Sequence, residues 1–427
     1  MTIMRNADGI RSKFSMAMSN MYKNEVPLYA ELLSIVADVD ERQSSEPLPK
    51  RNRIERHGAI RLGTAQELQT IARLFSLFNM HPIGYYDLSM VGFPFHATAF
   101  RPLTSDALAI NPFRVFTSLL RLDLLPEEIR RIAEYALSKQ DDLVTEALKT
   151  FKWHSAAEIA YEEFNFMRKA HPIVADICSF SSAHINHLTP RTIDIDLVQD
   201  AMMHRGMKPK DRIEGPPYRA CAILLRQTSF KALDERVRFD DGKGHIVNGH
   251  HTARFGEVEQ RGAAVTAKGR ALYDSLLHKV ELATAQKGGG EKIYQAILCK
   301  GFEAFPDNWS DLRKQGLVYF EYSVRNNEFI GEHRRAKLSE LIESRHIIYK
   351  PIVYEDFLPI SAAGIFTSNI AGSSNKVTQQ TKGDITLFQS YLGGEINEAN
   401  ALYESMQLES LKNCRRELGL IEIIMDE

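Results

Sequence analysis

The chain of 427 residues is 44% hydrophobic and 25% charged, the composition of a globular protein with a sizeable core. Its 53 lysines and arginines balance 55 acidic residues, which excludes an electrostatic footprint for nucleic acid or an anionic membrane. The four cysteines form no CxxC pair, which argues against a disulfide framework and a zinc ribbon. Because no segment resembles a signal peptide or a bilayer span, we expect a cytoplasmic protein that acts on a small molecule.

The first hundred residues predict a helix, a strand, a second helix and two further strands. Apolar residues three or four apart mark the helices, and short apolar runs between turn residues mark the strands. Thr64 and Glu67 form the capping box of the second helix. The expected elements are a helix over 9–36, a loop over 41–56, a strand over 56–63, a helix over 64–79, and strands over 83–88 and 95–100.

From Asn111 to Arg168 the pattern is helical, and one helix begins at Pro126. A second extended piece opens near residue 183 and starts another strand–helix–strands order, which indicates a fold of two paired β-α-β-β-β modules. The later elements expected are a helix over 195–205, strands over 220–228 and 252–261, a helix over 266–286 before a glycine linker, short strands, and a helix over 396–417.

The segment RHGAIR carries the first candidate site residues. On a strand, His57, Ala59 and Arg61 share one face, and the small alanine leaves room for a ligand. Four residues of strand span roughly 13 Å, which suits a metal at one end of a dicarboxylate and a guanidinium at the other. A surface strand whose Arg61 pairs with a neighbouring acid explains the segment equally well.

Two further segments carry histidines and carboxylates. On a strand, His184 and His187 point to opposite faces, so at most one of them joins a given site. In FGEVEQR, Glu257, Glu259 and Arg261 lie on one face, although a charged strand facing solvent has the same pattern. The pair His250–His251 follows a glycine-rich turn and is expected in a loop.

Two histidines and one carboxylate from separate strands would form a facial triad. This arrangement suits Fe(II), because it leaves adjacent positions open for a chelating substrate and O₂. The sequence contains no H-x-x-x-H helix motif for zinc, no P-loop, no dinucleotide-binding glycine motif and no G-x-S-x-G elbow. The pattern therefore favours a non-haem iron site over these alternatives.

At these segments the chain resembles the 2-oxoadipate dioxygenase/decarboxylase family, which includes bacterial D-2-hydroxyglutarate synthases. The resemblance covers essentially the whole chain. It rests on the strings ERHGAIRLGTAQEL, YYDLS, NPFRVFTSLLRL, HINHLTPRTIDID, EGPP, ILLRQTSFKAL, HTARFGEVEQRG and YEDFLPISAAGIF. The resemblance implies an α+β fold with a vicinal-oxygen-chelate-like core, a curved mixed sheet and large helical insertions.

The resemblance also implies which residues hold the metal. His57 in HGAIR matches the first iron ligand, and the second histidine of HINHLTP, His187, matches the second. The third is a glutamate of GEVEQRG, which we assign to Glu259, with Glu257 as the alternative because both face the same way.

The substrate residues follow from the same resemblance. Arg61 matches a residue that binds a substrate carboxylate, and PISAAG matches a contact made by the backbone of Ile360 and by the hydroxyl and backbone of Ser361. No catalytic residue beyond the metal and substrate ligands is implied. The expected domain is a single catalytic unit over 1–427, with core modules over 54–103 and 183–265, a helical insertion over 104–182, and an extension over 266–427 that contributes to the substrate pocket.

The implied reaction uses Fe(II) and O₂ to convert 2-oxoadipate into 2-hydroxyglutarate and CO₂, as in lysine catabolism. A single 2-oxo dicarboxylic acid supplies both the electrons and the carbon that is hydroxylated. Two other functions stay open: a metal-dependent isomerase or lyase of the same fold, and a small-molecule-binding homologue without activity. Oxygen uptake coupled to CO₂ release would separate the first function from both others.

Overall fold

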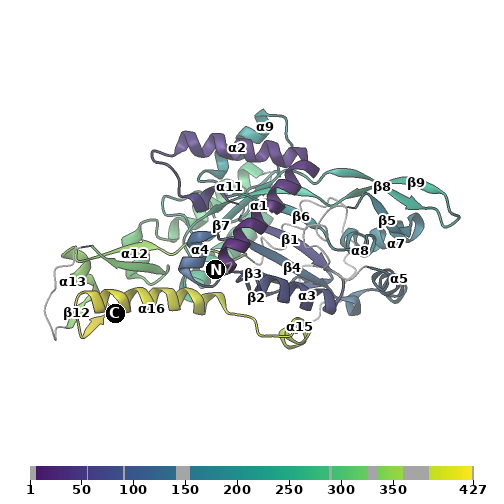
Figure 1. Ribbon diagram of the computed structural model, residues 1–427. Coiled ribbons are helices and arrows are strands. Elements are labelled where there is room, and N and C mark those ends of the chain that lie inside the picture. Colours follow the sequence, from purple (N-terminus) through teal and green to yellow (C-terminus); the bar gives the residue numbers. More distant parts are fainter. Residues whose placement is uncertain are drawn as a thin grey trace. The chain divides into compact units, whose positions relative to one another are not determined.

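The largest sheet among the described residues is mixed and has seven strands. Figure 1 labels most of these strands in the computed structural model. The structure describes residues 6–54, 56–89, 92–140, 154–287, 291–325, 335–358 and 384–425. The strand order is β2-β3-β4-β1-β6-β10-β7. The bounds are β1 (His57–Leu62), β2 (His81–Asp87), β3 (Phe95–Arg101), β4 (Arg114–Leu120), β6 (Ile185–Thr189), β7 (Leu225–Ser229) and β10 (Phe255–Arg261). A mixed sheet with many helices confirms the expected α+β class.

The sheet consists of two halves that repeat one order of elements. In the first half, β1 is followed by helix α3 (Ala65–Ser76) and by β2, β3 and β4; in the second, β6 is followed by α9 (Ile195–His204), β7 and β10. The first strands of the two halves, β1 and β6, pair antiparallel at the centre. The last strand of each half pairs parallel with the first strand of that half. The expected strand–helix–strands order is therefore repeated, and within the described residues the first half gives four strands to the sheet and the second half three.

Strand β4 departs from the helical pattern expected between Asn111 and Arg168. It pairs with β1 and β3, and all of its residues are buried. A strand that is buried on both faces lacks the alternation of apolar and polar residues, so its sequence also fits helical spacing. The first module therefore extends to Leu120, and the helix α5 (Glu127–Leu137) follows it, with Glu127 and Glu128 in its first turn.

The long helix expected at the N-terminus is two helices, α1 (Ala7–Glu25) and α2 (Pro27–Gln43). Proline lacks a backbone N–H and pushes the residue before it out of the helical region. Val26 accordingly has a non-helical conformation and ends α1, and Pro27 opens α2. The capping box of α3 is as expected, because Thr64 accepts from the Glu67 N–H and the Glu67 carboxylate accepts from the Thr64 N–H.

Helices cover both faces of the sheet. One apolar cluster joins Ile60 and Leu62 of β1 to side chains of α1, α2, α3 and α9. The other joins Ala59 of the same strand to side chains of α5 and of two more helices, α7 (Tyr161–Ala170) and α8 (Pro172–Cys178). Because successive residues of a strand point to opposite faces, the two clusters lie on the two sides of β1. His57 and Arg61 share the face of Ala59.

Smaller sheets and helices complete the chain. One three-stranded sheet consists of β5 (Ala156–Ala160), β8 (Asp234–Asp240) and β9 (Ile246–Thr252), and two-stranded sheets join β11 (Phe320–Val324) to β13 (Ile347–Pro351) and β12 (Arg335–Lys337) to β14 (Glu422–Ile424). The other α-helices among the described residues are α4 (Ser105–Ile110), α10 (Ala267–Lys287), α11 (Glu291–Gly301), α12 (Trp309–Lys314), α13 (Leu338–Glu343), α15 (Ile385–Leu392) and α16 (Ala399–Glu417). Within the described ranges, no helix combines the length and apolar character needed to cross a bilayer.

The chain divides into two compact units. The first comprises Met1–Glu214, Gln227–Gln260 and Asp356–Asn397, and the second comprises Gly215–Arg226, Arg261–Glu355 and Glu398–Glu427. His57, Arg61, His187, Glu257 and Glu259 all belong to the first unit. The assignment of the whole chain to a single catalytic domain stays a prediction.

Candidate metal centre

The two candidate histidines lie on the paired central strands β1 and β6. In the antiparallel register His57 is opposite Thr189, and His187 is opposite Ala59, so the histidines are diagonal neighbours on one face. Their ring centroids are 5.4 Å apart, and both side chains are fully buried. The small Ala59 side chain lies opposite His187 in the register.

A carboxylate from the adjacent strand β10 completes the cluster. Glu257 Oε2 lies 3.0 Å from His57 Nε2 and 3.6 Å from His187 Nε2. One ligand atom from each of these three buried residues lies within 4.8 Å of the other two. The parallel register that places Phe255 beside His187 explains this position, because Glu257 is two residues further along the strand. Phe255 also stacks on the His187 ring, with centroids 4.7 Å apart.

Several atoms in this cluster are unsatisfied in a way that fits a bound cation. Three buried atoms have no hydrogen-bond partner among the described residues: the two ring nitrogens of His187 and Oε1 of Glu257. Buried polar atoms in proteins are normally hydrogen-bonded or bound to a metal. Burial, followed by the charge of His57, holds the pKa of His187 well below its usual value, so the ring is in the neutral form that binds metals. Two imidazole nitrogens and one carboxylate suit a divalent transition metal.

Glu259 lies at the other side of the His57 ring. Its Oε2 is 2.7 Å from Arg114 Nη2 and 3.1 Å from His57 Nδ1, and its Oε1 is 3.4 Å from Arg56 Nε. Burial alone would raise the pKa of Glu259, but Arg114, His57 and Arg56 outweigh burial and hold the carboxylate ionised. The structure thus brings Glu257, and not Glu259, together with both histidines.

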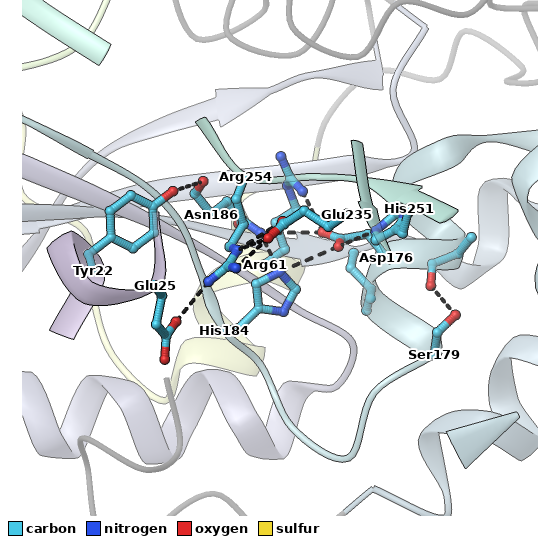
Figure 2. A network of polar contacts seen from close by, with 12 residues as sticks. Tyr22, Glu25, Arg61, Asp176, Ser179, His184, Asn186, Glu235, His251 and Arg254 are labelled. Carbon is cyan, nitrogen blue, oxygen red and sulfur yellow. Dashed lines mark hydrogen bonds and ion pairs between the residues drawn. The ribbon is translucent and has the colours of Figure 1, made fainter. Parts of the chain in front are cut away.

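Arg61 lies on the same face of β1 as His57 and is buried. Its Nη1 pairs with Oδ2 of Asp176, which belongs to α8 (Figure 2). The alternative of a surface strand is wrong, because Arg61 is only 4% exposed. The other part of that alternative, an ion pair between Arg61 and an acid nearby in space, is confirmed by the contact with Asp176.

His184 and His251 both contact Asp176 (Figure 2). His251 Nε2 is 2.8 Å from Asp176 Oδ1, and His184 Nε2 is 3.5 Å from the same oxygen. His251 was expected in a loop, but it is a buried residue of β9 that pairs with β8. A register shift in β6 lies between His184 and His187, because His187 is opposite Ala59 whereas Ile185 is opposite Ile60. The two histidines therefore do not alternate as expected for a regular strand, and of the two it is His187 that belongs to the metal cluster.

Two side chains at the site were not found from the sequence. Phe357 packs edge-on against His57 with ring centroids 4.8 Å apart, and the Arg114 guanidinium lies 4.7 Å from its ring centre. Both residues occur in the strings that carried the family resemblance, NPFRVFTSLLRL and YEDFLPISAAGIF, but nothing in their spacing indicated a role. Ile360 and Ser361 lie outside the described residues.

A cluster of two histidines and one carboxylate on a mixed α+β sheet defines the class of the chain as a candidate metalloenzyme. Residues 14–369 match the family model of 2-oxoadipate dioxygenase/decarboxylase. The chain therefore belongs to the 2-oxoadipate dioxygenase/decarboxylase family, as the sequence motifs predicted.

Close relatives support the assignment over nearly the whole chain. The 2-oxoadipate dioxygenase/decarboxylase of Pseudomonas putida is 43% identical over 97% of this chain and 97% of its own. The Escherichia coli protein of that name is 43% identical over 96% of this chain and 98% of its own. The crystal structure of hydroxyglutarate synthase from Pseudomonas putida in complex with 2-oxoadipate has a TM-score of 0.87 and 42% identity, and the match covers 97% of this chain and 99% of that one.

Proposed function

We propose that this chain oxidatively decarboxylates and hydroxylates 2-oxoadipate, with Fe(II) as its metal. The reaction consumes one O₂ and yields one 2-hydroxyglutarate and one CO₂, so that all atoms balance without a separate reductant. The observation that carries the proposal is the buried cluster of His57, His187 and Glu257, whose ligand atoms converge and are partly unsatisfied. Membership of the family supports the choice of substrate and reaction.

The ligands we propose for the iron are His57, His187 and Glu257. This choice replaces Glu259, which was the first assignment from the sequence, because the geometry favours the neighbouring acid. These three residues would hold Fe(II), and the ion would supply the chemistry that activates O₂ towards a 2-oxo acid.

Glu259 fits the role of the carboxylate that orients His57. When Nε2 of a histidine binds a metal, Nδ1 carries the proton and can only donate. Glu259 can accept this proton at 3.1 Å, while Arg114 donates to the same carboxylate oxygen at 2.7 Å. Arg56 and Arg114 thus balance the charge of Glu259 and keep it in the acceptor form.

The substrate would extend from the metal along β1 towards Arg61. A strand rises about 3.3 Å per residue, so the α-carbons of His57 and Arg61 are roughly 13 Å apart, and both side chains point to one face. We assign Arg61 to bind the distal carboxylate through its two-pronged donor edge. We retain Ile360 and Ser361 as further substrate contacts on the strength of the family resemblance. Phe255 and Phe357 pack against the two histidine rings and exclude water from them.

The test is anaerobic reconstitution with Fe(II) followed by oxygen-electrode measurements with 2-oxoadipate. We expect one iron per chain, and oxygen uptake that matches CO₂ release. His57→Ala should lose both the iron and the turnover, whereas His204→Ala, which alters an exposed histidine at the end of α9, should keep both. Binding of 2-oxoadipate without oxygen uptake would contradict the proposal, and it is the result expected of an inactive homologue or a Lewis-acid lyase.

A further inference from the structure

The Arg61 side chain, which belongs to β1, forms an ion pair with an acidic residue of the helix α8. Asp176 of α8 pairs with Arg61 Nη1, and both side chains are almost completely buried. A buried guanidinium without a counter-charge would carry a large desolvation cost, which Asp176 offsets. Figure 2 shows Arg61 and Asp176 within a network that also includes His184, Asn186 and His251.

Residues of two strands other than β1 also form hydrogen bonds with the Asp176 carboxylate. Its Oδ1 lies 2.8 Å from His251 Nε2 on β9, and its Oδ2 lies 3.3 Å from the side-chain amide of Asn186 on β6. His184 approaches Oδ1 at 3.5 Å. Burial would raise the pKa of Asp176, but His184, Arg61 and the hydrogen bond from His251 outweigh it and keep the acid ionised.

The position of the guanidinium depends on this anchor. The backbone of β1 fixes only where the arginine begins, and an arginine side chain has several rotatable bonds. A carboxylate that is fixed from α8, β6 and β9 limits the guanidinium to one position relative to His57, at the other end of the strand. The distance from that position to the metal determines which length of dicarboxylate can reach both.

We propose that Asp176 is a positioning residue that fixes the Arg61 guanidinium at a set distance from the metal centre and so selects the chain length of the 2-oxo dicarboxylic acid. This inference rests on the proposed function. A guanidinium has five N–H donors, more than one carboxylate oxygen can accept, so Asp176 can hold Arg61 while a substrate carboxylate binds the same side chain. His251 and Asn186 act through Asp176 and do not touch the substrate.

The direct test is Asp176→Asn, which keeps the size of the side chain and removes its charge. For 2-oxoadipate we expect KM to rise by about 10- to 100-fold, as for loss of a charged hydrogen bond, while kcat changes much less and iron content does not change. The ratio of kcat/KM for 2-oxoadipate over 2-oxoglutarate, which is one methylene shorter, should fall. Asp8→Asn removes the partly buried acidic partner of the buried Arg11 on α1 and is the matched control, for which KM should not change.

A second pair of variants covers the case in which Asp176→Asn does not fold. His251→Phe removes the hydrogen bond to Asp176 and keeps an aromatic ring against Phe164 and Phe180. It should raise KM in the same direction by a smaller factor, and His251→Gln, which restores a donor, should return KM towards the wild-type value.

The outcomes separate the two claims. A wild-type protein that does not turn over 2-oxoadipate contradicts the proposed function. An active wild type whose Asp176→Asn and His251→Phe variants keep its KM and its chain-length ratio overturns the inference alone. A lower KM in Asp176→Asn also overturns it, because that result would make Asp176 a competitor of the substrate carboxylate.

Discussion

At the scale of single residues, His57 has an acidic side chain at each ring nitrogen. Glu257 lies 3.0 Å from Nε2, and Glu259 lies 3.1 Å from Nδ1. Only the Nε2 side also faces His187, so the two glutamates have different surroundings although they are two residues apart on one strand. One is placed to bind a cation, and the other to hold the ring in the required tautomer.

This difference predicts different effects of the two glutamate-to-glutamine changes. Glu257→Gln removes a proposed ligand and should reduce Fe(II) affinity by more than about 100-fold, whereas loss of an orienting carboxylate typically costs about 10- to 100-fold. The measurement is an anaerobic competition titration with a chelator on both variants. If Glu259→Gln loses the metal and Glu257→Gln retains it, Glu259 is the ligand, as first assigned from the sequence.

Arg61 allows a prediction about substrate choice. Arg61→Ala should lower kcat/KM for 2-oxoadipate by about 30- to 1000-fold, the effect of about 2–4 kcal/mol from a charge-assisted, two-pronged contact, with little change in iron affinity. The comparison substrate is 2-oxohexanoate, which lacks the distal carboxylate and should be poor for the wild type. Oxygen uptake with both acids gives the ratio. A wild type that uses both equally, or a variant with the wild-type ratio, would remove Arg61 from this role.

The sequence indicated some of these residues and could not indicate others. The spacing in RHGAIR predicted that His57 and Arg61 share one face, because strand geometry fixes which residues share a face. The burial of that face is known from the structure alone. The same geometry could not choose between Glu257 and Glu259, since residues two apart are equivalent in a strand pattern. Asp176 was not predicted, because a single acid in a short helix has no spacing relation to a residue more than a hundred positions away.

At the scale of elements, the site depends on the order of three neighbouring strands. β1, β6 and β10 each contribute one side chain to the metal cluster, and each is buried where it does so. The short extended segments in the sequence predicted β1 and β6, whereas the pattern over β4 predicted a helix. The misreading arose because the apolar residues Phe113, Phe116 and Leu120 also recur at helical spacing. Pairing partners far apart in sequence, which decide such cases, cannot be read from local periodicity.

Close packing behind β10 predicts that Gly256 does not tolerate a side chain. A Cβ at this position would lie 2.4 Å from Phe230 and 3.0 Å from Tyr29, both of them buried rings. Gly256→Ala should reduce the free energy of unfolding by about 1–3 kcal/mol and weaken metal binding through the adjacent Glu257. Gly9→Ala is the control, because its Cβ meets nothing within 4 Å on α1 and should stabilise the protein by about 0.4–1 kcal/mol. Equal urea stability of Gly256→Ala and the wild type would contradict this account of the packing.

At the scale of the whole molecule, the burial of histidines links stability to pH. Burial, followed by the charge of Arg121, lowers the pKa of His96 to about 4, and burial, followed by the charge of Arg61, lowers that of His171 to about 4. An unfolded histidine titrates near pH 6.5, so the unfolded chain takes up protons first as the pH falls. The stability from these groups is fully present above about pH 6.5 and is lost as the pH falls towards 4.

The expected result is a steep loss of stability in mild acid. Each of the two histidines should contribute about 1.4 kcal/mol per pH unit to the slope of the unfolding free energy between about pH 6 and 4.5. Urea denaturation of the wild type and of His96→Gln across this range measures the contribution of His96. The variant should have the shallower slope, while His204→Gln should match the wild type. A His96→Gln curve parallel to that of the wild type would show that the buried ring is not neutral as described.

The order of elements that is repeated in the two halves of the sheet brings the two histidines of the metal cluster together. One histidine comes from the first strand of each half, and the two strands meet at the centre of the sheet. This repeat could be predicted from the order of elements alone, but the three-stranded sheet of β5, β8 and β9 and the division into two units could not. These features depend on contacts between segments that share no sequence pattern.

The most direct test of the proposed function is the fate of the two oxygen atoms in the reaction of 2-oxoadipate with ¹⁸O₂. If a single substrate is both decarboxylated and hydroxylated, mass spectrometry should find one ¹⁸O in the newly formed carboxylate of 2-hydroxyglutarate and one in its hydroxyl group. Each O₂ consumed should accompany one CO₂ and one 2-hydroxyglutarate, with no other 2-oxo acid required. A 2-hydroxyglutarate without label, or CO₂ release without oxygen uptake, would contradict the proposed function.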